Sequence, residues 1–128
     1  METLADLAHV ADVLSLHVPG GVATHHMINR AVLAAMKPGA ILVNTARGVV
    51  VDEAALVDAL GDGTIGAAAL DVYEREPAVH PGLLDHPRSV LLPHLGSATI
   101  EARMAMGMQV INNLEAFFTD ADLPNRAA

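Results

Sequence analysis

Short apolar runs alternate with helical patterns along the chain, as expected of strands and helices that follow one another in an α/β fold. Four runs predict strands, at residues 13–18 (VLSLHV), 40–45 (AILVNT), 66–72 (GAAALDV) and 89–93 (SVLLP). Each run is short, is bounded by proline, glycine or aspartate, and is mostly continuously apolar rather than alternating. Continuous runs of this kind are typical of parallel strands that are covered on both faces.

Helical patterns occupy the segments before, between and after these runs. Apolar residues recur at helical spacing in residues 3–11, 29–36, 53–60 and 99–118, with boundaries good to about 2–4 residues. Asn29 and Asp52 are placed to cap two of the helices, and Gly61 is expected to end the third. Three methionines of the last helix, at positions 104, 106 and 108, are expected to fill a core. The sequence therefore predicts an α/β fold with a parallel sheet of about four strands and helices on both faces.

Composition narrows the class of protein. The chain is 52% hydrophobic and 17% charged, which excludes an intrinsically disordered protein. A net charge of −8 argues against a nucleic-acid partner, and no apolar run reaches the ~18–20 residues of a membrane span. The chain has no cysteine, and no other ligand motif accompanies the pair His25–His26, so no metal site is predicted. The N-terminal segment lacks the basic start and apolar core of a signal peptide, which predicts a cytoplasmic protein.

Four polar side chains follow successive predicted strands. They are Arg47 after the second strand, Asp71 at the end of the third with Glu76 beyond it, and His94 after the fourth. The carboxyl ends of parallel strands share one edge of the sheet, where open α/β sheets bind ligands. Arginine matches a carboxylate with two parallel hydrogen bonds, and histidine can donate a proton near neutral pH. Each residue alone also fits a structural role, as a surface arginine, a solvated acidic loop or a capping histidine, but together they predict a site.

One glycine pattern fits the dinucleotide fingerprint G-x-G-x-x-G, at residues 61–66 (GDGTIG). In a true fingerprint the glycines follow a strand and open a helix, so that the helix N-terminus faces the pyrophosphate. Here a predicted helix precedes the glycines and a predicted strand follows them. The pattern is therefore interpreted as a helix C-cap and a turn.

The segments ADVLSLHVP, MKPGAILVNTARG, VVDEAALVDAL, AALDVYEREP and PHLGSAT, in this order, resemble the D-isomer-specific 2-hydroxyacid dehydrogenases from about Leu4 to Phe118. Within that family, PHLGSAT and DVYEREP look most like the glyoxylate/hydroxypyruvate reductase branch. The resemblance implies half of a Rossmann-like doubly wound domain, NAD or NADP as the cofactor, and hydride transfer to a small 2-oxoacid such as glyoxylate or hydroxypyruvate.

The resemblance also implies a role for each candidate residue. Arg47 would bind the carboxylate and carbonyl of the 2-oxoacid, and His94 would be the general acid. Glu76 would pair with His94 and keep it protonated, and Asp71 would hold the nicotinamide carboxamide. The positions lining the cofactor, largely through backbone atoms, would be Pro19, Thr45, Ala46, Arg47, His94, Gly96 and Ser97.

In that family the fingerprint glycine loop and the residue that selects the cofactor ribose precede the first strand seen here. The 128 residues contain neither of these, nor a separate substrate domain, so they are expected to form a partial dinucleotide-binding domain, the catalytic half. The bare edge of strand 13–18 predicts self-association. Two functions stay open: a piece of an oxidoreductase of this type, or a non-catalytic remnant that acts at most as a weak binding or association module. Upstream DNA that encodes a strand, the glycine loop and a helix in frame would favour the first.

Overall fold

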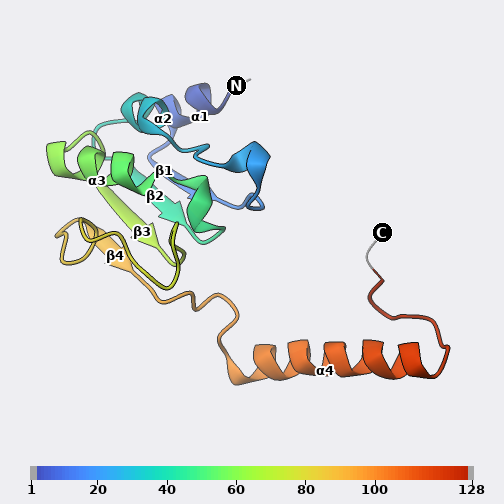
Figure 1. Cartoon of the computed structure of the whole chain (residues 1–128). Coiled ribbons are helices and arrows are strands. Elements are labelled where there is room, and N and C mark those ends of the chain that lie inside the picture. Colours follow the sequence, from blue (N-terminus) through green and yellow to red (C-terminus); the bar gives the residue numbers. More distant parts are fainter. Residues whose placement is uncertain (1–2, 127–128) are drawn as a thin grey trace. The chain divides into compact units, whose positions relative to one another are not determined.

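The computed structural model describes residues 3–126, in a first compact unit, Met1–His94, and a second, Leu95–Ala128 (Figure 1). The first unit contains a four-stranded sheet of β1 (Val13–Leu16), β2 (Ile41–Asn44), β3 (Ala67–Leu70) and β4 (Ser89–Leu91), in this order across the sheet. Every neighbouring pair is parallel. The predicted parallel sheet is confirmed, with each strand two or three residues shorter than its apolar run.

Three helices, α1 (Leu4–Val10), α2 (Arg30–Ala35) and α3 (Glu53–Asp62), precede and connect the first three strands, with short 3-10 turns η1 (Val22–Thr24) and η2 (Gly48–Val50). Asn29 and Asp52 cap α2 and α3 with side-chain oxygens, as predicted. The prediction that Gly61 ends α3 is wrong, because the helix continues to Asp62. Its C-cap is Gly63, whose φ of 83° is the left-handed conformation that glycine adopts without strain. The glycine pattern 61–66 is thus a helix end and a turn before β3.

The helices α1, α2 and α3 lie on one side of the sheet in Figure 1. Right-handed crossovers that each step to the next strand in the same direction place every helix on the same face. The register partners Leu14, Leu42 and Ala68 are buried under these helices. Helices on both faces are predicted from the sequence, and within this unit the structure differs. Its second face exposes Val13 (56%) and Val90 (61%).

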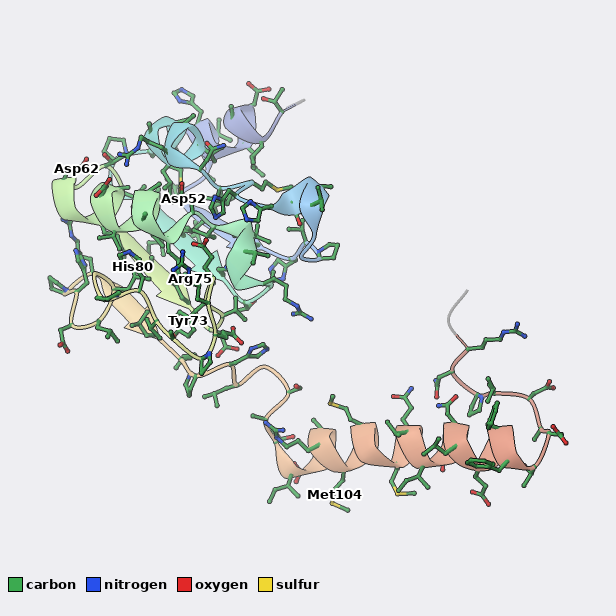
Figure 2. The ribbon with its side chains drawn as sticks, viewed as in Figure 1. Asp52, Asp62, Tyr73, Arg75, His80 and Met104 are labelled. Carbon is green, nitrogen blue, oxygen red and sulfur yellow. The ribbon has the colours of Figure 1, made fainter. Side chains whose placement is uncertain are left out.

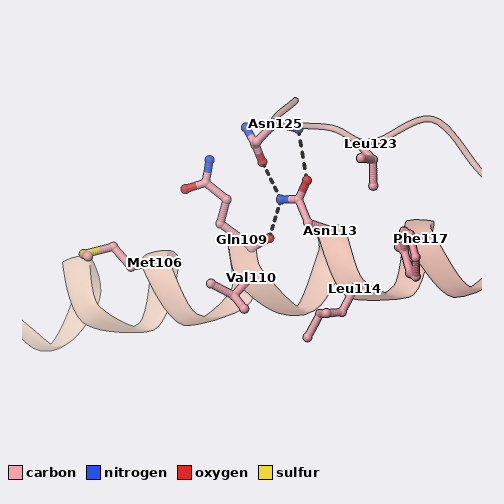
Figure 3. Close-up of a pocket in the computed structure, with 8 residues that line it drawn as sticks. All are labelled: Met106, Gln109, Val110, Asn113, Leu114, Phe117, Leu123 and Asn125. Atoms are coloured by element: carbon pink, nitrogen blue, oxygen red, sulfur yellow. Dashed lines mark hydrogen bonds between the residues drawn. The ribbon is translucent and has the colours of Figure 1, made fainter. Parts of the chain in front are cut away.

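The second unit consists of α4 (Ile100–Phe118) and the segment that follows it. Thr99 caps the helix by accepting a hydrogen bond from the Ala102 N–H at 3.1 Å. The side chain of Asn113 exchanges hydrogen bonds with Asn125, beside a hollow of about 570 Å³ along the helix (Figure 3).

The predicted burial of the α4 methionines is not found within the second unit, where Met104, Met106 and Met108 are 65%, 55% and 51% exposed. The described part of α4 has no buried residue. Helical spacing identifies a helix, but the partner of its apolar face depends on tertiary packing. In residues 3–126 no helix is long and apolar enough to cross a membrane.

Candidate active site

The carboxyl ends of the four strands are level with one another. Leu16, Asn44, Leu70 and Leu91 are register partners in one row across the sheet. The residues predicted for the site follow this row directly or within a few positions. Thr45 and Asp71 come immediately after β2 and β3, whereas Pro19 and His94 come three residues after β1 and β4. The fold therefore brings the candidates of the first unit to one edge of the sheet, as predicted.

His94 and Glu76 form the central contact of this edge, with Nδ1 of His94 2.9 Å from Oε2 of Glu76. The hydrogen bond from His94 is the main cause that lowers the pKa of Glu76 below its ordinary value, and the charge of Arg47 lowers it further. Glu76 is therefore a carboxylate at neutral pH, able to orient the imidazole and stabilise its charged form. Because Nδ1 bonds to Glu76, Nε2 is the ring nitrogen through which His94 could pass a proton to a bound molecule.

Tyr73 ties the loop of Glu76 to the strand end of His94. Its backbone N–H donates to Oε1 of Glu76 at 3.0 Å, and its buried hydroxyl donates to the carbonyl of Leu92 at 2.7 Å. Burial raises the pKa of Tyr73, and the charge of Asp71 raises it further, so the hydroxyl remains a donor. His94 has a φ of 54°, a conformation that costs energy for any residue other than glycine and that persists where surrounding contacts impose it.

Arg47 lies in a turn whose backbone is held by two hydrogen bonds to the side chain of Asn44. The Asn44 side chain is 1% exposed, accepts a hydrogen bond from the Ala46 N–H at 3.0 Å and donates one to the Arg47 carbonyl at 3.0 Å. A buried amide is stabilised when such partners satisfy it. The turn buries Ala46 and exposes Thr45 and Arg47 beyond the strand end. The Thr45 side chain is therefore exposed at the edge where a ligand would approach, and Nη1 of the Arg47 guanidinium donates a hydrogen bond to the Ala46 carbonyl at 2.7 Å.

The remaining candidate residues are Asp71, Pro19, Gly96 and Ser97. Asp71 is 6% exposed, and the charge of its carboxylate raises the pKa of the Tyr73 hydroxyl. The Pro19 carbonyl accepts a hydrogen bond from the Thr24 hydroxyl at 2.6 Å. Gly96 and Ser97 are exposed and belong to the second unit. A pocket of about 350 Å³ is lined by Glu76 and His94 among mostly apolar side chains, and Arg47 is not among its lining residues.

Four residues that shape this edge are not predicted from the sequence: Asn44, Tyr73, Glu53 and His26. A polar side chain at the end of an apolar strand is a signal for Asn44, because a buried amide needs local partners. His26 stacks on His25, with ring centroids 4.0 Å apart, and its Nε2 lies 3.1 Å from Oε1 of Glu74. Within residues 3–126 no three acidic or histidine side chains gather in a way that could hold a metal ion.

Comparison with known proteins gives one consistent result. Residues 1–96 match the NAD-binding domain of the D-isomer-specific 2-hydroxyacid dehydrogenases. Glyoxylate/hydroxypyruvate reductase B of Enterobacter agglomerans is 52% identical over 114 residues, which are 88% of this chain and 35% of that protein. Glyoxylate reductase of Thermococcus litoralis is 50% identical over 90% of this chain and 35% of its own length.

Solved structures agree. The NADPH-dependent glyoxylate/hydroxypyruvate reductase of Sinorhizobium meliloti, in complex with NADP and malonate, matches with a TM-score of 0.94 and 44% identity, over 100% of this chain and 40% of that one. The holo form of Rhodotorula graminis D-mandelate dehydrogenase matches with a TM-score of 0.92 and 37% identity, over 100% and 37%. The chain thus spans between a third and two-fifths of the length of these relatives.

Proposed function

The chain belongs to the D-isomer-specific 2-hydroxyacid dehydrogenase family, and we propose from this membership that it supplies the catalytic half of the NAD(P)-binding domain in such an oxidoreductase. The observation that carries the proposal is the Glu76–His94 pair at the carboxyl edge of the sheet, with the charge of Arg47 acting on the same carboxylate. The proposed substrate is a small 2-oxoacid such as glyoxylate or hydroxypyruvate, the class for which the Enterobacter and Thermococcus relatives are named.

The residues at this edge fit the nicotinamide end of NAD or NADP. Asp71 offers a buried carboxylate just beyond β3, and a carboxylate is a strong acceptor for the N–H groups of a carboxamide. Pro19, Thr45 and Ala46 are proposed to line the same cofactor. Gly96 and Ser97, whose backbone could offer N–H donors, complete the proposed set. The cofactor would supply the hydride, and the Sinorhizobium relative was solved with NADP.

The chain's own residues would bind the substrate and move one proton. Arg47 would hold the carboxylate of the 2-oxoacid through its planar guanidinium and polarise the neighbouring carbonyl. His94 would donate the proton on Nε2 to the carbonyl oxygen, which becomes the hydroxyl of the product. Glu76 would stabilise the imidazolium before transfer and hold the ring in place. In the opposite direction neutral His94 would accept the hydroxyl proton.

Self-association and a cytoplasmic location are further parts of the proposal. The β1 edge and the exposed apolar residues Val13 and Val90 support association with a second polypeptide, because unpaired edges and open apolar faces favour pairing. The alternative function, a non-catalytic binding module, would need the same surface and none of the proton chemistry. Activity therefore distinguishes the two.

A chimera tests the proposed function. The chain would replace the segment that it matches in the Sinorhizobium reductase, whose remaining residues supply the rest of that enzyme. We expect saturable oxidation of NADPH with glyoxylate or hydroxypyruvate. A chimera that folds cooperatively and binds NADPH but shows no turnover would support the non-catalytic alternative.

A further inference from the structure

We propose that Glu53 is a positioning residue, whose buried carboxylate fixes the peptide of Glu74 and through it the geometry of the Glu76–His94 pair. Its catalytic meaning rests on the proposed function. The geometry that supports it lies entirely within the first unit and involves three segments: the start of α3, the loop after β3 and the segment between η1 and α2.

Glu53 is the first residue of α3, and it is only 4% exposed. An acidic residue at this position usually lies in solvent, where it interacts with the helix dipole. Here the carboxylate accepts a hydrogen bond from the Glu74 N–H at 2.8 Å. Burial of a carboxylate costs free energy unless hydrogen bonds compensate it, so this contact and the buried position depend on each other. Burial also raises the pKa of Glu53, whereas the hydrogen bond from Glu74 lowers it.

The Glu74 peptide lies next to the contact that holds Glu76. The N–H of Tyr73 donates to Glu76, while the N–H of the next residue, Glu74, donates to Glu53. Two successive peptides are therefore fixed, one by the proposed catalytic carboxylate and the other by Glu53. If the Glu74 peptide turned, the Tyr73 N–H would move with it, and Glu76 would lose a hydrogen bond that fixes its position relative to His94.

Glu74 is also held through its side chain. Nε2 of His26 lies 3.1 Å from the Glu74 carboxylate, and the His26 N–H donates to the Val49 carbonyl at 2.8 Å. A pocket of about 470 Å³ lies beside these groups, lined also by Asp52, Arg75 and His80, which Figure 2 labels. This pocket leaves one side of the loop unpacked, so the hydrogen bonds from the Glu74 N–H to Glu53 and between His26 and the Glu74 carboxylate help to set the position of the loop.

The alternative role of Glu53 is to stabilise α3 by its charge at the helix N-terminus. Three substitutions separate the two roles. Glu53→Gln keeps an oxygen that can accept the hydrogen bond but removes the charge. Glu53→Asp keeps the charge but is one methylene too short to reach the Glu74 N–H. Glu53→Ala removes both, and Glu101→Ala removes an exposed glutamate of α4 as a matched control.

The readout is the pKa of the Glu76 carboxyl, measured by carbon NMR of the 128-residue chain and assigned with Glu76→Gln. We expect this lowered pKa to be kept in Glu53→Gln and Glu101→Ala, and to rise toward its ordinary value in Glu53→Asp and Glu53→Ala. The charges that lower it belong to His94 and Arg47, so a rise would report a change in geometry rather than the loss of a neighbouring charge. Unfolding temperatures of all variants show which of them are folded.

An unchanged Glu76 pKa in folded Glu53→Asp and Glu53→Ala would overturn the inference, as would a rise in Glu53→Gln with none in Glu53→Asp. If Glu53→Ala does not fold, the contrast between the Gln and Asp variants decides alone. The measurement needs no turnover. An inactive chimera would therefore leave its result intact, and an unchanged pKa would leave the proposed function intact.

Discussion

Gly48 lies directly against the peptide that joins Tyr73 to Glu74. A Cβ built on this glycine would stand 1.8 Å from the Tyr73 carbonyl carbon and 2.4 Å from the Glu74 nitrogen. The turn that exposes Arg47 and the loop that carries Glu76 therefore meet backbone to backbone, and only a residue without a side chain allows this contact. The candidate site depends on the contact, because it brings the turn of Arg47 and the loop of Glu76 to the same sheet edge.

Gly48→Ala should therefore destabilise the first unit. Backbone atoms cannot yield as a flexible side chain does, so we expect a loss of about 3 kcal/mol or more in the free energy of unfolding. Urea unfolding measures it. Gly61→Ala is the matched control, since it lies within α3 and its added methyl group meets nothing within 4 Å. That variant should be more stable by about 0.5–1 kcal/mol. Equal stability of the two variants would contradict the close approach.

The pairing of Glu76 with His94 predicts a pH dependence of stability. The folded-state pKa of Glu76 is lowered, so its contribution is complete above the ordinary value of 4.5 and is lost as pH falls through the lower folded value. Between about pH 5.5 and pH 3 the free energy of unfolding should thus fall more steeply for the parent chain than for Glu76→Gln. The effect should be small, because the two side chains are 36% and 47% exposed. Parallel curves from urea unfolding would exclude a native-state interaction.

Self-association should depend on the open face of the sheet. Val90 is 61% exposed there, and sedimentation velocity of the 128-residue chain should show concentration-dependent association. Val90→Lys should weaken it, because a charge must then be desolvated in the contact. Val22→Lys is the control, since Val22 is fully exposed in η1, outside the sheet. A parent chain that stays monomeric at high concentration would contradict the prediction.

The purified 128-residue chain should not reduce glyoxylate or hydroxypyruvate at an enzymatic rate with either cofactor. The glycine pattern at residues 61–66 ends α3 rather than opening a helix, so it offers no helix N-terminus to a pyrophosphate. Hydride transfer also needs close positioning, and a misplacement of about 1 Å can cost about 100-fold in rate. Absorbance of the reduced nicotinamide gives the readout. Saturable turnover that His94→Ala abolishes would contradict this prediction.

Features with a local cause could be predicted from the sequence. The strands could be predicted from the apolar runs. The caps at Asn29 and Asp52 could be predicted because short polar side chains precede helical patterns. The shared sheet edge could be predicted because parallel strands end at the same side of a sheet. Features with a tertiary cause could not. The one-sided cover of the sheet within the first unit follows from the crossovers all stepping in one direction. The exposure of Met104 could not be predicted, because helical spacing does not show what the apolar face of a helix packs against.

The candidate site shows the same division. Glu76 and His94 both follow strands, so their place at one sheet edge could be predicted, whereas their pairing is what the resemblance to the family implies. Glu53 has the sequence position of an ordinary helix-start acid. Its burial arises only because the loop after β3, distant in sequence, lies over it and offers the Glu74 N–H.

The turnover of the Sinorhizobium chimera with and without His94 tests the central claim most directly. If His94 donates the proton to the 2-oxoacid, His94→Ala should lower kcat by about 100- to 10,000-fold, the usual contribution of a general acid, and should change KM for the oxoacid far less. Arg47→Ala in the same chimera should impair both constants, because the guanidinium would bind and polarise the substrate. A folded His94→Ala chimera with the kcat of its parent would contradict the proposed role of His94.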